Sequence, residues 1–415
     1  MEKYQIKGGR RLSGKVDISC AKNAVLPLMA GALLTNEEVI IKNCPKIVDV
    51  YSMIKILRCI GVDAEFIGND LRICADGLNS EVVPFTVAKE LRSSVFMLGV
   101  LLAKNKRAEI PYPGGCEIGL RPIDMHVASL KSLGVVVEED GGKIICDSSN
   151  MKSGDVYLDF PSVGATENLM LASVFTKSET TIKNCAKEPE VVDLMNFLNS
   201  MGAKVCGAGT DTIKIEGVKK LHGTVYKPIP DRIEAGTFLI ATAITGGEVE
   251  LSNVNPENIS SLIHKLCDNT CKISLNNDII YIKCGKSKKS FTIDTNPYPG
   301  FPTDLQAQMT ALATVCKGTS VITENVFEMR FKFAKELIKM GANIKLYGRT
   351  AIIKGVKRLF GTTITAPDLR GGAALVLGGL VAEGTTIING VRHIERGYDG
   401  FENKLLSLGA DIKKI

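Results

Sequence analysis

The sequence has no tryptophan, only four histidines, and no two cysteines at the CxxC spacing of many metal and redox sites. Its twelve cysteines are scattered over 415 residues. In a chain of this size that pattern argues against a zinc site and against a disulfide framework. We therefore expect reduced thiols, a cytoplasmic protein and no metal site.

Long apolar runs and strong charge of one sign are also missing. No run approaches the roughly 20 apolar residues that cross a bilayer, and the start, MEKYQIKGGRRLSG, has no apolar segment typical of a secretory signal. The 51 Lys+Arg and 45 Asp+Glu give a net charge of only +6. We expect neither a membrane nor a nucleic acid as partner. Small anionic substrates, which need only a few well-placed cations, fit this composition better.

A short signature recurs at intervals of about 70 residues, longer than the periods of common solenoid repeats. It consists of an apolar residue, usually a glycine, and a strand-like segment. Copies begin at Ile60, Leu133, Met201, Met340 and Leu408, and a degenerate copy begins at Cys267. The pattern predicts an apolar helix, a strand and a second helix before each copy, with short strands after it. Six such units predict an α/β fold.

The six units divide naturally into three and three. The segment YKPIPDRIE at 226–234 carries two prolines between the third and fourth units, and Asp231 within it is expected to cap the next helix. We predict a first domain at 22–229 and a second domain that combines 1–21 with 230–415. Two domains joined by two crossings imply a cleft that can open and close.

The segment PGGCEIGLRP at 113–122 is too rich in glycine for a regular helix or strand. It is expected to form a loop. A loop that carries the Cys116 thiol close to Arg121 is a candidate lid that brings chemistry to a bound anion. A surface turn with an incidental cysteine is the alternative interpretation.

Several cations lie among apolar or glycine neighbours and outside charge runs. Lys22 and Asn23 occupy an expected strand-to-helix transition, where backbone amides favour an anion; a solvated lysine in a first turn is the alternative. The candidate arginines are Arg92, Arg121, Arg330, Arg370 and Arg396. One such arginine is usually structural, but five at matching positions of the repeats indicate an anion site.

Asp304 follows two prolines and a glycine in YPGFPTD, an irregular turn before an expected helix. Its carboxylate is either a favourable charge at a helix N-terminus or a general base. Ser162, Val163 and Gly164 form another tight turn before a helix. Their backbone groups are candidates for ligand contacts.

These segments resemble the UDP-N-acetylglucosamine 1-carboxyvinyltransferase family, the UDP-GlcNAc enolpyruvyl transferases, over essentially the whole chain. The motifs that carry the resemblance are AKNAVLP, LRSS, PGGCEIGLRPIDMH, SVGAT, AKEPEVVDL, PDRIEAGTF, FPTDLQAQ, TENVFEMRF, DLRGGAAL and HIERGYDGFE. The cysteine loop distinguishes this family from the 3-phosphoshikimate 1-carboxyvinyltransferases, which share the sixfold repeat. The resemblance implies two inverse α/β barrels, each built from three βαβαββ repeats, with the active site in the cleft between them.

The resemblance also implies a reaction, the first committed step of peptidoglycan synthesis. Enolpyruvate moves from phosphoenolpyruvate (PEP) to the 3′-hydroxyl of UDP-N-acetylglucosamine, and phosphate is released by addition and elimination through a tetrahedral ketal. No cofactor or metal is required, because arginines stabilise the charge. The epoxide fosfomycin is expected to react with Cys116.

Residue roles follow from the same resemblance. Cys116 would protonate the enol carbon and form a covalent adduct with PEP, since a thiol with a pKa of about 8.5 is mostly protonated at pH 7. Asp304 would take the proton of the sugar hydroxyl. The PEP site would comprise Lys22, Asn23, Arg121, Arg330, Arg370 and Arg396, with Lys22 and Arg396 also acting in catalysis. The UDP-sugar would contact Arg92, Arg121, Pro122, Ile123, Asp124, Met125, Phe160, Pro161, Ser162, Val163, Asp304 and Val326.

Two positions depart from the family pattern: Phe96 replaces a frequent tryptophan, and Gly371 replaces the usual alanine. Neither is assigned to proton transfer, but Phe96 could alter packing near the sugar site. Two other functions are alternatives to the one that the resemblance implies. The cysteine loop disfavours a 3-phosphoshikimate 1-carboxyvinyltransferase, and the complete catalytic set disfavours a non-catalytic, UDP-sugar-binding regulatory paralogue.

Overall fold

The computed structural model describes residues 2–112, 114 and 123–415, which fall into two compact units. The N-terminal unit holds residues 20–112, 114 and 123–229, and the C-terminal unit holds residues 2–19 and 230–415. Each unit has its own hydrophobic core. Cys116, Arg121 and Pro122 lie outside the described residues.

The described residues of the N-terminal unit form three β-sheets. Their strand orders are β13(Thr224–Tyr226)–β3(Val39–Ile41)–β5(Asp70–Cys74)–β4(Asp63–Ile67), β9(Asp155–Tyr157)–β10(Glu179–Lys183)–β12(Thr212–Glu216)–β11(Lys204–Cys206), and β6(Arg107–Pro111)–β8(Lys143–Asp147)–β7(Val136–Asp140). In both four-stranded sheets a parallel pair comes first and two antiparallel pairs follow. The two sheets are therefore copies of one topology.

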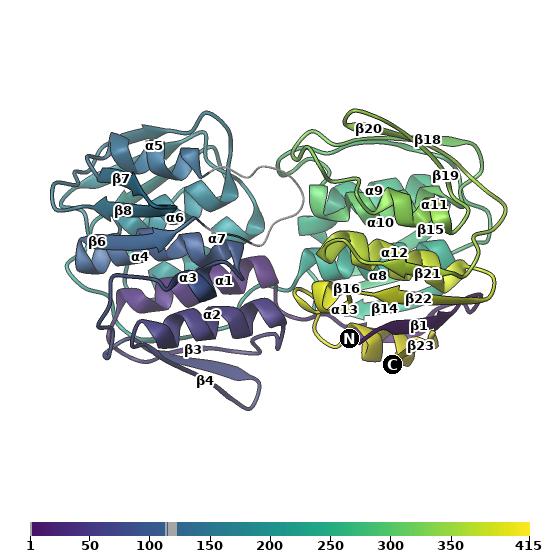
Figure 1. The fold of residues 1–415 in the computed structure, drawn as a ribbon, viewed down its shortest axis with the longest axis horizontal. Helices are drawn as coiled ribbons and strands as arrows, with labels where there is room; N and C mark the ends of the chain where they lie inside the picture. The colour runs from purple at the N-terminus through teal and green to yellow at the C-terminus, as the bar shows by residue number, and fades with distance from the viewer. Residues whose placement is uncertain (1, 113, 115–122) are drawn as a thin grey trace. The chain divides into compact units, whose positions relative to one another are not determined.

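The three sheets of the C-terminal unit repeat this topology. Their strand orders are β2(Ser13–Asp17)–β14(Glu248–Ser252)–β16(Ile279–Cys284)–β15(Cys271–Asn276), β17(Thr292–Asp294)–β18(Thr319–Thr323)–β20(Thr350–Lys354)–β19(Asn343–Tyr347), and β21(Thr363–Thr365)–β22(Thr385–Asn389)–β1(Tyr4–Lys7)–β23(Asp411–Lys414). The first strand of the chain, β1, lies between β22 and β23 and runs antiparallel to both (Figure 1). It takes the place that a hairpin strand fills in the other sheets, so the start of the chain completes its last sheet.

Helices that are buried on nearly all sides form the interior of each unit. They are α1(Lys22–Gly31), α4(Phe96–Asn105) and α6(Val163–Ser173) in the N-terminal unit, and α8(Arg232–Thr245), α10(Gln306–Ala313) and α12(Leu369–Val381) in the C-terminal unit. Apolar residues all round are typical of such core helices. Within the units α4 packs against α6 and α10 packs against α12.

The remaining helices bury one face and expose the other. They are α2(Val48–Cys59), α3(Phe85–Ala88), α5(Asp124–Ser132), α7(Pro189–Ser200), α9(Ser260–Asp268), α11(Ala334–Lys339), α13(Val391–Glu395) and α14(Phe401–Ser407), with 3-10 turns at Ala32–Leu34, Arg92–Val95, Pro256–Ile259 and Thr303–Leu305. Over the described ranges, none of the helices combines the length and apolar character needed to cross a membrane. The predicted α/β class with sixfold repetition is confirmed.

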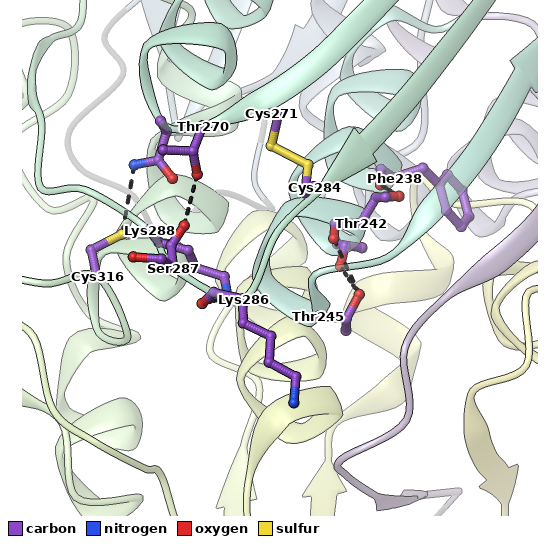
Figure 2. The surroundings of a disulfide bond; sticks show 12 residues. Phe238, Thr242, Thr245, Thr270, Cys271, Cys284, Lys286, Ser287, Lys288 and Cys316 are labelled. Carbon is purple, nitrogen blue, oxygen red and sulfur yellow. Dashed lines mark hydrogen bonds between the residues drawn. A yellow bond between two sulfur atoms is a disulfide. The ribbon is translucent and has the colours of Figure 1, made fainter.

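One expectation about the cysteines is wrong. Cys271 and Cys284 form a disulfide bond (Figure 2), with their Cα atoms 4.3 Å apart. They are 13 residues apart in sequence but directly opposite each other in the register of β15 and β16. A search for cysteines close together in the sequence does not detect this pair, because only the pairing of β15 with β16 brings the two residues close in space. The other cysteines in the described part of the chain are thiols.

Candidate active site

Asp304 lies in the 3-10 turn before α10, and two buried arginines hold its carboxylate. Arg330 Nη2 donates to Oδ1, and Arg370 Nη2 donates to Oδ2 at 2.9 Å. Each arginine side chain is 4% exposed, and that of Asp304 is 24% exposed. Burial alone would raise the pKa of Asp304, but Arg370 and Arg330 outweigh burial and hold this pKa well below its usual range. The carboxylate is therefore ionised at neutral pH.

Local hydrogen bonds place Arg370 at the start of α12. The Asp368 side chain caps this helix and accepts from the backbone N–H groups of Arg370, at 3.0 Å, and Gly371, at 2.9 Å. The Arg370 guanidinium lies over the ring of Tyr398, 5.5 Å from its centroid. The Tyr398 hydroxyl is bonded in turn to Thr237 at 2.8 Å. Arg370 is thus held from both its backbone and its side chain.

Glu324 positions the turns that carry Asp304 and Arg330. Its buried carboxylate accepts from the hydroxyls of Thr295 at 2.9 Å and Thr303 at 2.8 Å. It also accepts from the backbone N–H groups of Val326 at 2.9 Å and Phe327 at 3.1 Å. One carboxylate therefore ties together the end of β17, the turn containing Asp304 and the turn leading to Arg330. Sequence reasoning missed Glu324, although it lies in the TENVFEMRF motif.

The two arginines retain donors for a further partner. Arg330 Nε and Arg370 Nη1 are buried and have no hydrogen-bond partner among the residues that the structure describes. A buried N–H group without an acceptor is unfavourable. The charge of Arg232, at the start of α8, also lowers the pKa of Asp304. The arrangement suits an anionic ligand with several oxygen atoms.

The other predicted site residues of the C-terminal unit lie at element ends. Arg396 is half-buried and directly follows α13. Val326 is half-buried, and its backbone N–H is fixed by Glu324. The structure therefore brings Asp304, Arg330 and Arg370 into direct contact. Val326 is held by Glu324, which also positions the turns that carry Asp304 and Arg330.

In the N-terminal unit, Lys22 begins α1 and forms an ion pair with Asp49 from the first turn of α2. Lys22 Nζ lies 2.7 Å from Asp49 Oδ2, and the two side chains are 12% and 3% exposed. Asn23 follows in the same helical turn and is half-buried. The alternative interpretation of Lys22 as a solvated lysine is wrong. Sequence reasoning missed Asp49, for which the sequence offers no signal beyond an acidic residue near a helix start.

The residues predicted to contact the UDP-sugar occupy turns and helix starts of the N-terminal unit. Arg92 begins a 3-10 turn before α4, and Ser162 caps α6 by accepting from the Ala165 N–H at 3.4 Å. Ile123 is buried, Met125 and 161–163 are half-buried, and Asp124 and Phe160 are exposed. A cavity of about 130 Å³ between α5 and β9 is lined by Met125, Ala128, Ser129, Ser132, Asp155, Val156, Tyr157, Leu158 and Asp159.

In the described part of the chain, no three His, Cys, Asp or Glu side chains are grouped so that they could hold a metal ion. Cys116, Arg121 and Pro122, three of the predicted site residues, lie outside the described residues. Their roles stay predictions.

Known proteins resemble the chain from end to end. The family described as EPSP synthase (3-phosphoshikimate 1-carboxyvinyltransferase) matches residues 6–405. UDP-N-acetylglucosamine 1-carboxyvinyltransferase 2 of Caldanaerobacter subterraneus subsp. tengcongensis is 50% identical over 100% of both chains. UDP-N-acetylglucosamine 1-carboxyvinyltransferase 1 of Symbiobacterium thermophilum is 50% identical over 100% of this chain and 95% of its own. The chain belongs to the UDP-N-acetylglucosamine 1-carboxyvinyltransferase family. The resemblance inferred from the sequence motifs is confirmed.

Solved structures share the fold of this UDP-N-acetylglucosamine 1-carboxyvinyltransferase family member. The enolpyruvyl transferase NikO from Streptomyces tendae superposes with a TM-score of 0.88 at 24% identity, covering 100% of this chain and 98% of its own. An EPSP synthase from Acinetobacter baumannii gives a TM-score of 0.78 at 19% identity over 100% of both chains. These likenesses support the predicted inverse α/β barrel architecture.

The structure explains one departure from the usual pattern of the UDP-N-acetylglucosamine 1-carboxyvinyltransferase family. A Cβ atom at Gly371 would lie 2.9 Å from Cβ of Phe333 and 3.0 Å from Oδ2 of Asp368. Glycine thus lets the start of α12 approach its neighbours closely. Phe96, the other departure, is 7% exposed and forms part of the core of its unit.

Proposed function

We propose that this chain transfers the enolpyruvyl group of PEP to the 3′-hydroxyl of UDP-N-acetylglucosamine and releases phosphate. The observation that carries the proposal is full-length identity of 50% to two proteins named for this reaction. The reaction is the first committed step of peptidoglycan synthesis. A cytoplasmic location is part of the proposal, since PEP is an intermediate of central metabolism.

PEP carries about three negative charges at neutral pH, two on phosphate and one on carboxylate. In our proposal several cations bind its phosphate and carboxylate. Arg330 and Arg370 supply two buried donors that no described residue accepts. The remaining PEP contacts in the proposal are Lys22, Asn23, Arg121 and Arg396. Arginine suits both anionic groups because its planar fork donates two parallel hydrogen bonds.

The addition step needs a base at the sugar and an acid at the enol. Asp304 takes the proton of the 3′-hydroxyl as the sugar oxygen bonds to C2 of PEP, and Cys116 gives a proton to C3. The product is a tetrahedral ketal. In the elimination step C3 loses a proton, the bond from C2 to the phosphate oxygen breaks, and the double bond re-forms. Cations at the phosphate stabilise the leaving group.

The UDP-sugar is proposed to bind at helix starts of the N-terminal unit and at Asp304. Its contacts are Arg92, Arg121, Pro122, Ile123, Asp124, Met125, Phe160, Pro161, Ser162, Val163, Asp304 and Val326. The cavity beside Met125 supports part of this set. The positive end of the α6 helix dipole suits the diphosphate.

Phosphate release from PEP tests the proposal. The purified protein is assayed with UDP-N-acetylglucosamine and, in parallel, with shikimate 3-phosphate. We expect release only with the UDP-sugar, and we expect it to fall at least 100-fold in Asp304→Asn, which cannot accept the proton. Release only with shikimate 3-phosphate would assign a different acceptor. UDP-sugar binding without release would instead indicate a regulatory protein.

Fosfomycin tests the proposed role of Cys116 separately. The inhibitor is incubated with the protein, and intact mass and peptide mapping follow. We expect one added molecule at Cys116 and none on Cys116→Ser. No addition to the unsubstituted protein would contradict a reactive thiol at this position.

A further inference from the structure

The geometry around Asp304 is unfavourable for the base that the reaction needs. Arg330 occupies one carboxylate oxygen and Arg370 the other. A general base must accept a proton from the hydroxyl that it activates, and this requires an available lone pair and sufficient basicity. The two arginines reduce both properties. An event that loosens these ion pairs would therefore favour activation of the sugar hydroxyl.

The same two arginines have donors through which a ligand could loosen their ion pairs with Asp304. Arg330 Nε and Arg370 Nη1 are buried donors that no described residue accepts, whereas their Nη2 atoms bind Asp304. An anion that reaches the free donors would compete with Asp304 for the same guanidinium groups. Because the side chains are almost fully buried, little water screens this competition.

We propose that the anionic substrate, when it binds Arg330 and Arg370, draws these guanidinium groups away from Asp304 and so frees the carboxylate to accept the sugar hydroxyl. This inference rests on the proposed function, because it takes PEP as the anion and UDP-N-acetylglucosamine as the source of the hydroxyl. Asp304 is then a base that becomes active only when the electrophile is present.

A measurable consequence is coupling between the two ligands. An anion that frees Asp304 also strengthens the hydrogen bond from the sugar hydroxyl to this carboxylate. By thermodynamic linkage, the sugar must then strengthen binding of the anion by the same factor. A hydrogen bond to a charged acceptor corresponds to roughly a tenfold or greater change in affinity.

Titration calorimetry with 2-phospholactate tests this coupling. This PEP analogue keeps the phosphate and the carboxylate but has no enol, so it cannot react. We expect UDP-N-acetylglucosamine to bind the native enzyme about tenfold more tightly in its presence. In Asp304→Asn the enhancement should shrink to less than threefold. An enhancement of equal size in both proteins would overturn the proposal, and so would the absence of enhancement in the native enzyme.

Arg370→Gln provides a second test with an effect in the opposite direction. Removing one ion pair should release Asp304 in part, so UDP-N-acetylglucosamine should bind this variant severalfold more tightly than the native enzyme when no analogue is present. Turnover should fall, because the anion site loses a cation. Weaker or unchanged sugar binding by Arg370→Gln would contradict the release of Asp304.

Two controls separate this inference from the proposed function. Glu383→Gln removes one carboxylate from an exposed ion pair with Arg358 of the same unit, and its ligand coupling should equal that of the native enzyme. Native turnover with PEP and the UDP-sugar is measured in the same preparation. Turnover without coupling would overturn the inference alone, whereas absent turnover and absent sugar binding would overturn the proposed function.

Discussion

Replacing Glu324 by glutamine tests how the site is held in place. The buried carboxylate accepts four hydrogen bonds, two from threonine hydroxyls and two from backbone N–H groups. A hydrogen bond contributes about 1.5–3 kcal/mol when one partner is charged and about 0.5–1.5 kcal/mol when both are neutral. A neutral amide thus weakens each bond by roughly 1 kcal/mol. Because an amide is also easier to desolvate, we expect the free energy of unfolding to fall by about 2 kcal/mol.

The same substitution should impair turnover more than binding. With its carbonyl oxygen in place of Oε1, the glutamine turns its NH₂ group toward the Thr303 hydroxyl, which must reorient to accept; this weakens the hold on the turns that carry Asp304 and Arg330. Displacement of reacting groups by about 1 Å can lower rates about 100-fold. We expect kcat of Glu324→Gln to fall between about 10-fold and 100-fold, with a smaller change in KM.

Urea unfolding and phosphate release measure the two effects. Glu383→Gln is the matched control, because it removes the same charge from an exposed carboxylate paired with Arg358 at 2.8 Å. Its free energy of unfolding should lie within about 0.5 kcal/mol of the native value. Native stability together with native kcat in Glu324→Gln would refute the positioning role of this residue.

Three further predictions concern other buried groups. Asp49→Asn removes the buried ion pair between Asp49 and Lys22, so we expect unfolding free energy to fall by about 3 kcal/mol and KM for PEP to rise severalfold in steady-state kinetics. Joint replacement of Cys271 and Cys284 by serine should lower the free energy of urea unfolding by about 2–3 kcal/mol, because the bond closes a short loop in the unfolded chain. Burial raises the pKa of Asp193 to about 6, so the folded protein binds more protons than the unfolded chain between pH 4 and 6. Unfolding free energy should therefore fall by up to about 3 kcal/mol as pH rises through this window, and Asp193→Asn should flatten the dependence.

For each of these three predictions, a control variant or a specific outcome can contradict the reasoning. Asp70→Asn breaks a more exposed ion pair with Lys42 and should change stability little. If Asp70→Asn lost as much unfolding free energy as Asp49→Asn, burial would not explain the effect of the Asp49 substitution. Equal stability with and without a reducing agent would contradict a stabilising disulfide, and Cys206→Ser, at an exposed thiol, controls for the substitution itself. A native pH dependence in Asp193→Asn would assign the effect to other groups.

Local signals in the sequence sufficed to predict much of the fold. The sixfold signature predicted the repeated units because each copy carries the same alternation of helix and strand. The predicted cap is also present: Asp231 accepts from the N–H groups of Ile233 at 2.7 Å and Glu234 at 2.9 Å. Capping depends on residues two or three positions apart, and sequence reasoning can detect relations over such distances.

Contacts between distant residues could not be predicted in this way. Asp304 meets Arg330 and Arg370 across 26 and 66 residues, and the sequence identified all three without indicating that the arginines bind the carboxylate. Glu324 was missed for a related reason. Its partners come from three separate turns, and only the folded chain brings these turns together.

The position of the site residues follows from the architecture of the core. A helix that is buried on nearly all sides presents polar groups to a ligand mainly at its ends. Each of the six core helices begins at or just after a residue or turn assigned to the site: Lys22 at α1, Arg92 before α4, Ser162 before α6, Arg232 at α8, Asp304 before α10 and Arg370 at α12. The helix dipole favours anions at these positions, although side-chain caps already accept from N–H groups at the starts of α6, α8 and α12. A fold made of six such units therefore places charged or hydrogen-bonding groups at the starts of its buried helices, and the proposed site residues are drawn from these positions.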